Sequence, residues 1–280
     1  IVDVQRGGPS TGLPTKTEQS DLLQALYGRN GESPVVVVAA KSPSDCFDMA
    51  YHASKIAMEH VTPVILLTDG YVANGSQPWK IKKMADLDDI VPYTVDSSDN
   101  AETWEPYIRD ENTLARKWVV PGTEGFEHRI GGLEKDETTG NVSYAPENHE
   151  RMVKVREEKV ARVAHYIPDL KVEGNQEGDL LIVGWGGTFG ALLTAGEEVE
   201  ANGRIGLAHF NYIKPLPKNT AEVFSRFKKI VVCELNNGQF VKYLRAELPQ
   251  FDYLQYNKIQ GLPFSTSELI DRFTEILKED

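Results

Sequence analysis

Five stretches of the sequence are almost continuously apolar over six or seven residues, and this pattern limits the possible folds more than any other feature. They lie at 35–40, 63–68, 179–184, 205–210 and 229–235, and a shorter run, IVDV, begins the chain. A strand with one face in water alternates apolar and polar residues, whereas a strand buried on both faces does not. We therefore expect strands of parallel sheets that are covered by helices on both sides.

Helical patterns occupy the intervals between these runs. Thr15 and Glu18 fit a T-x-x-E capping box, which predicts a helix through about Tyr27 that stops at Gly28. Further helices are expected after Ser44, Gly190 and Gly238, and over 267–279. Strands that alternate with helices favour right-handed βαβ units, so the expected fold class is α/β with three-layer sheets.

A middle segment of about 80 residues differs from the α/β stretches at 1–95 and 176–280. Residues 124–150 are charged and rich in glycine, and they contain almost no aliphatic runs. The pattern at 149–166 predicts a helix. We expect a long surface connection followed by a linking helix over 96–175. A connection of this length usually serves function or a subunit contact.

Charge and cysteine content exclude several classes of protein. The net charge of −12 disfavours binding to nucleic acid, because phosphate backbones need Lys and Arg. No apolar run approaches the roughly 20 residues that span a bilayer, so no membrane partner is expected. Cys46 and Cys233 stand far apart, and without a C-x-x-C motif the chain cannot ligate an iron–sulfur cluster by itself. The six histidines are scattered, so no metal site is expected within the chain, and two separate thiols fit a cytoplasmic location.

The segment QRGGPSTGLPT, residues 5–15, is a candidate anion-binding loop. Arg6 is the first residue after the opening strand, and parallel α/β sheets place their ligand crevices at the carboxyl ends of strands. A guanidinium group binds a carboxylate through two parallel hydrogen bonds. Glycines that permit positive φ stand at 7, 8 and 12, and hydroxyl groups stand at 10, 11, 15 and 17. The alternative, a structural turn in which Arg6 pairs with a nearby Asp or Glu, is left open.

Three other turns follow predicted strands. In TDGYVANGS, Asp69 is interpreted as a helix N-cap, with a role at the rim of the site or at an interface as the alternative. GWGGTFGA, at 184–191, follows a strand and opens a helix as a phosphate-binding turn does, but its glycine spacing is not a clean dinucleotide fingerprint, and a Rossmann cofactor site is the open alternative. In CELNNGQF, Cys233 is predicted to be a packed thiol, and pairing of Glu234 across a subunit boundary is the open question.

The loop at residues 4–22, VQRGGPSTGLPTKTEQSDL, resembles the alpha subunit of 2-oxoacid:ferredoxin oxidoreductases, in particular the 2-oxoglutarate (2-oxoglutarate synthase) type. The resemblance continues through SPSDCFDMAYHASKIAMEHVTPVILLTDGYVANG, LLIVGWGGTFGA, YIKPLP and CELNNGQ, and it covers essentially the whole chain.

The resemblance implies a division of the chain into three segments. Residues 1–95 would be the back half of a pyrimidine-type thiamine-binding domain, 96–175 a connection with a linking helix, and 176–280 a transketolase C-terminal-like domain. The family's YPITPSS-like motif and its thiamine-activating glutamate are absent from the sequence. We expect an N-terminally truncated chain whose thiamine-activating residues lie before Ile1, so its own cofactor-binding residues are unknown.

The resemblance also implies an activity. Family members decarboxylate a 2-oxoacid oxidatively onto coenzyme A, or run the reverse reaction, and exchange electrons with ferredoxin. Thiamine diphosphate and Mg²⁺ would be shared with a beta subunit that carries a [4Fe–4S] cluster, in a heterodimer and a higher oligomer of alpha–beta units. Arg6 matches the family arginine that pairs with the 2-oxoacid carboxylate, and Gly8, Ser10 and Thr11 are the other expected substrate-binding residues.

Alternatives remain within and outside this class. The substrate could be pyruvate or a branched-chain 2-oxoacid instead of 2-oxoglutarate. A transketolase-like or dehydrogenase-type enzyme would use thiamine with a different electron acceptor. A non-catalytic scaffold could keep the alpha-subunit fold, although the intact Arg6 loop argues against it.

Overall fold

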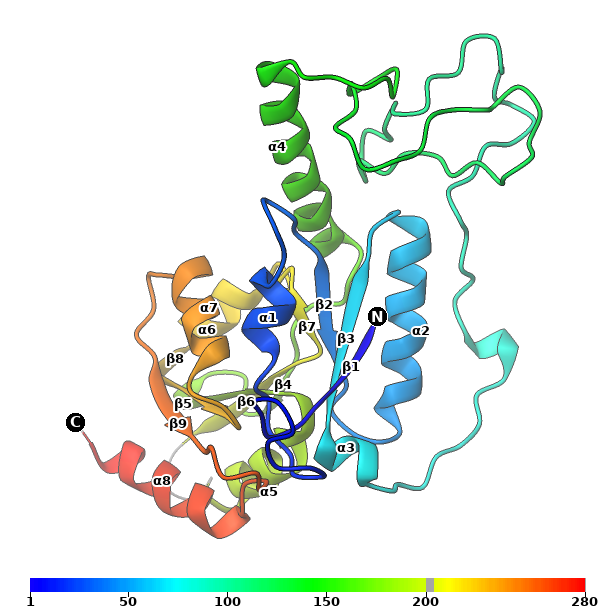
Figure 1. The fold of residues 1–280 in the computed structure, drawn as a ribbon. Coiled ribbons are helices and arrows are strands. Elements are labelled where there is room, and N and C mark those ends of the chain that lie inside the picture. The colour runs from blue at the N-terminus through cyan, green and yellow to red at the C-terminus, as the bar shows by residue number, and fades with distance from the viewer. Residues whose placement is uncertain (200–203, 280) are drawn as a thin grey trace.

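The apolar runs form the strands of two sheets (Figure 1). The computed structural model describes residues 1–199 and 204–279. In chain order the elements are β1 (Val2–Gln5), α1 (Leu22–Tyr27), β2 (Val36–Ala39), α2 (Asp45–Glu59), β3 (Val64–Asp69), α3 (Gly70–Asn74), η1 (Met84–Asp86), α4 (Pro146–Arg162), η2 (Val163–His165), β4 (Val172–Gly174), β5 (Gly178–Trp185), η3 (Gly186–Thr188), α5 (Phe189–Val199), β6 (Ile205–Phe210), β7 (Tyr212–Lys214), α6 (Thr220–Ser225), β8 (Phe227–Glu234), α7 (Gln239–Glu247), β9 (Leu254–Asn257) and α8 (Thr266–Lys278).

The first sheet has the order β1-β3-β2-β7. Strands β1, β3 and β2 are parallel, as the apolar runs predict, and β2 is buried along its whole length. Strand β7 is antiparallel to β2 and comes from a part of the chain more than 170 residues further on. The sequence did not reveal β7, because three residues at the end of another strand give no separate pattern.

The second sheet has the order β4-β6-β5-β8-β9. Four of its strands are parallel, and the short β4 is antiparallel to β6 at one edge. These parallel sheets between helices confirm the α/β fold class. The division into segments 1–95, 96–175 and 176–280 stays a prediction, and β7 shows that residues from the third segment extend the first sheet.

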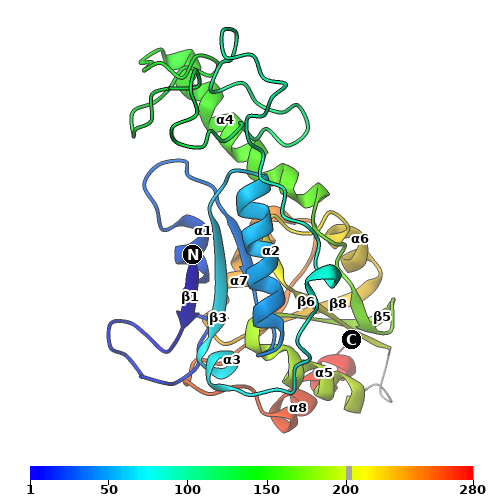
Figure 2. The same cartoon turned by 90° about the vertical axis from the view of Figure 1, so that its right-hand side faces the viewer.

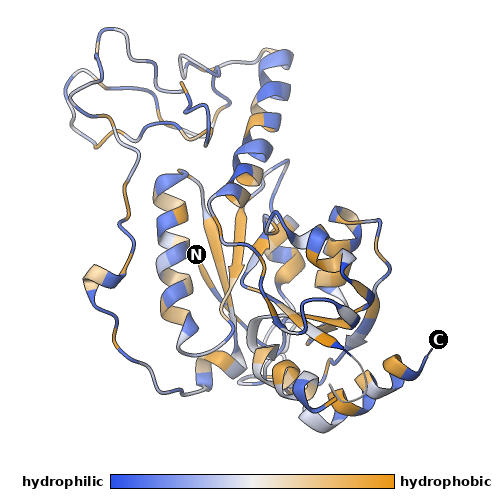
Figure 3. Ribbon diagram, turned by 180° about the vertical axis from the view of Figure 1, so that it is seen from behind, coloured by the Kyte–Doolittle hydropathy of each residue, from blue (hydrophilic) through white to orange (hydrophobic). Residues whose placement is uncertain are grey.

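Helices cover both sheets, and the two sheets share one core. One apolar cluster joins Val37 of β2 and Leu67 of β3 with Leu181 and Val183 of β5, so α1 and α7 lie over an interior common to both sheets. Helices α5 and α8 pack on the other face of the second sheet. Figure 3 shows the apolar strands inside and hydrophilic ribbon along α4 and the long connection. None of the helices within residues 1–199 and 204–279 has both the length and the apolar character needed to cross a lipid bilayer.

The segment from residue 75 to 145 is a long connection that extends away from the sheets (Figure 2). All of it is described, and apart from η1 it holds only turns and isolated bridges. Helix α4 then returns the chain to the body, and its Met152 and Val160 are buried. The helix predicted from residue 149 is present and starts three residues earlier, at Pro146, while the connection before it begins after α3, earlier than the predicted residue 96.

The predicted helix from Thr15 to Tyr27 is wrong in its first half. Thr15 has a φ of 64°, outside the helical region, and α1 begins only at Leu22. Gln19 is fully buried, and its main chain and side chain bond to residues of the second sheet. These long-range bonds outweigh the capping box, which offered only local stabilisation. Ser44 does stand at the N-cap of α2, but its hydroxyl bonds to Gln77 instead of capping the helix.

Candidate functional site

The carboxyl ends of β1 and β3 meet at one edge of the first sheet. The register pairs Gln5 with Asp69, so the residues that follow each strand lie side by side. Gln5 is buried; its Nε2 donates to the Thr68 carbonyl at 3.2 Å, and its Oε1 accepts from the Asp21 backbone N–H at 3.1 Å. The strand end that precedes Arg6 is therefore fixed on both sides.

The loop after β1 closes on itself. Gly7 N–H donates to the Lys16 carbonyl at 2.9 Å, and Leu13 N–H donates to the Gly7 carbonyl at 2.8 Å. Gly12 has a φ of 46°, and a Cβ there would lie 2.1 Å from the Gly7 oxygen, so only glycine fits. Gly7 and Gly8 do not adopt positive φ, which corrects the expectation for them, because the positive φ values of this turn fall at Ser10 and Gly12.

Arg6 lies at the base of this loop and is half-buried. Its Nη2 donates to the Ser10 carbonyl at 2.6 Å, and its Nη1 donates to the carbonyls of Thr11 and Gly7. Among the described residues Arg6 has no ion pair, and its Nε–H has no hydrogen-bond acceptor. The structural alternative, an Arg6–carboxylate pair, is therefore absent from the part of the chain described here.

Asp21 is a titratable neighbour of Arg6. Burial raises the pKa of the Asp21 carboxyl, and the Arg6 charge opposes that rise. Burial also raises the pKa of Asp3, with the negative charge of Asp21 as a second cause. Asp21 and Arg6 therefore interact electrostatically, although no ion pair joins them within the described residues.

The other predicted substrate-binding residues lie in the same loop. Ser10 and Thr11 are exposed, and their carbonyls, not their hydroxyls, contact Arg6. Gly8 is exposed, and a Cβ on it would meet nothing within 4 Å. The structure thus brings Arg6, Ser10 and Thr11 together, while the binding roles of all four residues stay predictions.

Asp69 fixes the loop to both sheets. Its Oδ1 accepts from the backbone N–H groups of Tyr71 and Val72 at 2.9 and 3.0 Å, which confirms the predicted N-cap. The same oxygen accepts from Thr17 Oγ1 at 3.1 Å, and Oδ2 accepts from Gly187 N–H at 2.8 Å. Asp69 therefore joins the Arg6 loop, the first sheet and the turn after β5.

Gln19 makes a second connection of the same kind, which the sequence analysis did not find. Its Nε2 donates to the Trp185 carbonyl at 2.7 Å, and its Oε1 accepts from Leu235 N–H at 2.9 Å. A Cβ on Gly186 would lie 2.7 Å from Gln19 Nε2, and one on Gly187 would lie 2.5 Å from Asp69 Oδ2. The glycines of GWGGTFGA thus permit this close packing, and in hindsight they were its only sequence signal.

Glu234, the last residue of β8, is fully buried and contacts the start of α7. Its carboxylate accepts from Phe240 N–H at 2.7 Å and Val241 N–H at 3.0 Å, and burial raises the pKa of the group. The alternative that Glu234 pairs across a subunit boundary is therefore wrong, because the side chain does not reach the surface. Cys233 is a buried packed thiol, as predicted, and burial raises its pKa.

A family model for pyruvate flavodoxin/ferredoxin oxidoreductases, thiamine diphosphate-binding, matches residues 1–146. The chain therefore belongs to this family of thiamine diphosphate-binding oxidoreductases.

Among curated proteins the chain is similar to the 2-oxoglutarate oxidoreductase subunit KorA of Mycobacterium tuberculosis, with 46% identity over 96% of this chain and 41% of that protein. It is also similar to the 2-oxoglutarate synthase subunit KorA of Methanothermobacter marburgensis, with 28% identity over 85% of this chain and 63% of that protein. A solved 2-oxoglutarate:ferredoxin oxidoreductase from Magnetococcus marinus, with 2-oxoglutarate, coenzyme A and succinyl-CoA bound, superposes with a TM-score of 0.89 at 34% identity, over 99% of this chain and 48% of that one. The chain spans about half the length of these relatives, and the predicted resemblance is confirmed.

The described residues contain no ready-made cage of metal ligands. Within 1–199 and 204–279 no group of three His, Cys, Asp or Glu side chains could hold a metal ion. Mg²⁺ on a diphosphate takes one or two protein carboxylates together with phosphate oxygens and water. The Arg6 loop offers a cation and hydroxyl groups, which suit a carboxylate.

Proposed function

We propose that the chain is part of the alpha subunit of a thiamine-dependent 2-oxoacid:ferredoxin oxidoreductase that acts on 2-oxoglutarate and coenzyme A. One observation carries this proposal: the half-buried Arg6 has no carboxylate partner in the described chain, and it lies at the strand edge where α/β sheets bind ligands. The similarity to a solved enzyme that contains 2-oxoglutarate and coenzyme A supports this choice of substrates.

In this proposal Arg6 holds the carboxylate that is lost as carbon dioxide. The carbonyls of Ser10 and Thr11 fix one side of the guanidinium, and its Nε–H remains available for the substrate. A fixed cation of this kind orients the bond that breaks, which is a positioning effect. The bond cleavage itself is the chemistry of thiamine diphosphate.

The proposal also includes the partners. A beta subunit would supply the Mg²⁺ and diphosphate ligands and the [4Fe–4S] cluster, ferredoxin would exchange the electrons, and alpha–beta units would form a higher oligomer in the cytoplasm.

The test is an Arg6→Lys and Arg6→Ala pair in the complete enzyme, with Arg129→Ala, an exposed arginine of the long connection, as the control. A charge-assisted contact of this kind costs about 2–5 kcal/mol when it is lost, and about 1.4 kcal/mol changes a rate tenfold. We expect kcat/KM for 2-oxoglutarate to fall by about two to three orders of magnitude in Arg6→Ala. Near-normal turnover would overturn the proposal and favour a scaffold.

A second pair of variants separates substrate binding from loop collapse, because Arg6 also holds its own loop. Gly12→Ala would disrupt the turn through its Cβ clash with the Gly7 oxygen, while Gly31→Ala, also at positive φ, meets nothing within 4 Å. If Arg6 acts only by holding the loop, Gly12→Ala and Arg6→Ala will reduce kcat/KM equally. If Arg6 binds the carboxylate, Arg6→Ala will reduce it more, and Arg6→Lys will recover part of the loss.

A further inference from the structure

A second concentration of positive charge lies far from Arg6, where the long connection meets α4. A cavity of about 420 Å³ there is lined by five cationic side chains and one carboxylate, namely Arg109, Arg116, Lys135, Arg156, Lys159 and Glu134. The whole chain has a net charge of −12, so this local excess of positive charge is opposite to the rest of the molecule. None of these residues belongs to the site described above.

The cavity is distant from the Arg6 edge. Lys159 donates to the carbonyl of Val61, which precedes β3, whereas Arg6 lies beside Asp69, which ends β3. At about 3.3 Å per residue, β3 from Val64 to Asp69 alone spans roughly 16 Å between them. The two sites therefore serve different groups.

Most of the cations in the cavity bond only to neutral groups. Lys135 is buried, and its Nζ donates to the carbonyls of Gly131 and Leu133 at 3.2 and 2.6 Å. Arg109 donates to a carbonyl at 3.1 Å, and Arg116 lies over the Tyr107 ring. These bonds satisfy donors but do not neutralise charge.

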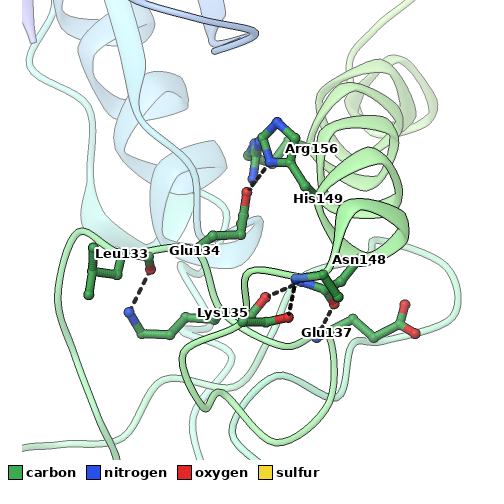
Figure 4. Close-up of polar contacts among 9 residues, drawn as sticks. Leu133, Glu134, Lys135, Glu137, Asn148, His149 and Arg156 are labelled. Carbon is green, nitrogen blue, oxygen red and sulfur yellow. Dashed lines mark hydrogen bonds and ion pairs between the residues drawn. The ribbon is translucent and has the colours of Figure 1, made fainter.

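The single carboxylate is shared. Glu134 lies 3.4 Å from Arg156 Nη1, and its other oxygen is 2.7 Å from His149 Nδ1 (Figure 4). Among the described residues, Arg156 is the one cation of the five with an ion pair.

The backbone places these like charges close to one another. An isolated antiparallel bridge places Arg109 directly opposite Arg116, an arrangement that destabilises a pair of like charges unless a counter-ion is present. Arg156 and Lys159 are three residues apart on α4 and so share one face. Burial and then the charges of Arg109, Arg116 and Arg156 lower the pKa of Lys159 to about 8.

Hydrogen bonds join the wall of the cavity to α4. Asn148 is buried; its Nδ2 donates to the Lys135 carbonyl at 2.8 Å, and its Oδ1 accepts from Glu137 N–H at 3.1 Å (Figure 4). Arg151 pairs with Glu137 at 2.9 Å on the same wall. The segment that carries Lys135 is thus attached to α4 before any ligand arrives.

We propose that this cavity binds a ligand that carries two or more phosphate groups. Phosphate oxygens accept the forked hydrogen bonds of Arg and neutralise several cations at once. Cavities of a few hundred Å³ are typical of small-molecule sites. Coenzyme A and a free nucleotide or polyphosphate share this chemistry.

The experiment titrates the complete protein, with its partner subunits, with pyrophosphate, ADP and coenzyme A in a calorimeter. Arg116→Gln is the variant of choice, because the Arg116 side chain donates no hydrogen bond to the described residues and its loss should not unfold the wall. Arg129→Gln, an exposed arginine of the same connection, is the matched control. We expect saturable binding of pyrophosphate, weakened about tenfold in Arg116→Gln and unchanged in Arg129→Gln.

A second readout concerns protons. A phosphate ligand would favour the charged form of Lys159, so binding near pH 8 should take up protons, measured as a dependence of the heat on the buffer, and Lys159→Gln should abolish that uptake. The charged or titratable neighbours of Lys159 are Arg109 and Arg116 from the connection, Arg156 from α4 and His60 at the end of α2. The arginines stay charged near pH 8, and burial lowers the pKa of His60 from its usual 6.5, so none of them titrates in this range.

The relative affinities distinguish coenzyme A from a free nucleotide or polyphosphate as the ligand. Coenzyme A binding more tightly than ADP and pyrophosphate, with the preference lost in Arg116→Gln, identifies coenzyme A as the ligand; equal affinities identify a free polyphosphate. No saturable binding of any of the three, or equal losses in Arg116→Gln and Arg129→Gln, would overturn the proposal. The measurement needs no turnover, so it is independent of the proposed reaction.

Discussion

Replacing Asp69 with Asn should destabilise the whole protein, because this carboxylate joins two sheets and the Arg6 loop. Asp69 is almost fully buried and accepts four hydrogen bonds, three on Oδ1 and one, from Gly187 N–H at 2.8 Å, on Oδ2. An asparagine has one acceptor oxygen. If that oxygen keeps the three donors of α3 and Thr17, the amide NH₂ faces the Gly187 N–H. If the amide is flipped, its NH₂ faces the three donors instead, which leaves more donors without an acceptor.

The magnitude follows from these contacts. A hydrogen bond to a charged acceptor contributes about 1.5–3 kcal/mol, and each buried donor left without a partner costs about 1–3 kcal/mol. The Asp69→Asn variant loses the hydrogen bond from Gly187 N–H and places the new amide NH₂ against that N–H, so both donors lack an acceptor. We therefore expect the free energy of unfolding to fall by about 3–5 kcal/mol. Domains are stable by about 5–15 kcal/mol, so the change would be a large fraction of the total.

The assay is urea unfolding of the complete protein, followed by far-ultraviolet circular dichroism. Asp252→Asn is the control, because it removes the same charge from an exposed position. We expect Asp69→Asn to lower the unfolding midpoint clearly and Asp252→Asn to leave it within error. Equal midpoints for the two variants would refute the role assigned to the four hydrogen bonds.

Three further predictions concern the same fold. Gly187→Ala should destabilise by about 2–4 kcal/mol in urea unfolding, because its Cβ would lie 2.5 Å from Asp69 Oδ2, whereas Gly190→Ala, with nothing within 4 Å, should not. Glu234→Ala should cost about 2–4 kcal/mol in the same assay, since two N–H groups at the start of α7 lose their acceptor. Lys159 has its pKa lowered from 10.5 to about 8 in the folded state, so the stability it contributes is full above pH 10.5 and is lost as the pH falls to 8. Between pH 8 and 10.5 the free energy of unfolding of the wild type should therefore rise by on the order of 3 kcal/mol relative to that of Lys159→Met. Urea unfolding at both pH values measures this difference.

The strands could be predicted because each apolar run carries its own signal. The runs at 35–40 and 205–210 became β2 and β6 within a residue or two. The start of α1 could not be predicted, because it depends on bonds between Gln19 and Leu235, which are 216 positions apart. The capping box at Thr15 and Glu18, a local signal, instead predicted a helix that starts near Thr15.

The candidate site shows the same contrast. The position of Arg6 at a strand end followed from the opening run, but its contacts with the carbonyls of Ser10 and Thr11 depend on turn geometry that residue types do not specify. The basic cavity was missed for a related reason. Arg109, Lys135 and Lys159 are scattered through acidic sequence, and only the folded connection brings them together.

The antiparallel strand β7 has a consequence for synthesis. Hydrogen-bonding groups on the β7 side of β2 find their strand partner only when Tyr212–Lys214 has left the ribosome, about 175 residues after Ala39. At a translation rate of about 5–20 residues per second, the edge of β2 in the nascent chain stays unpaired for roughly 10–35 s. Unpaired margins of that kind attract other chains. We therefore expect newly made molecules to need shielding by chaperones until translation passes this point.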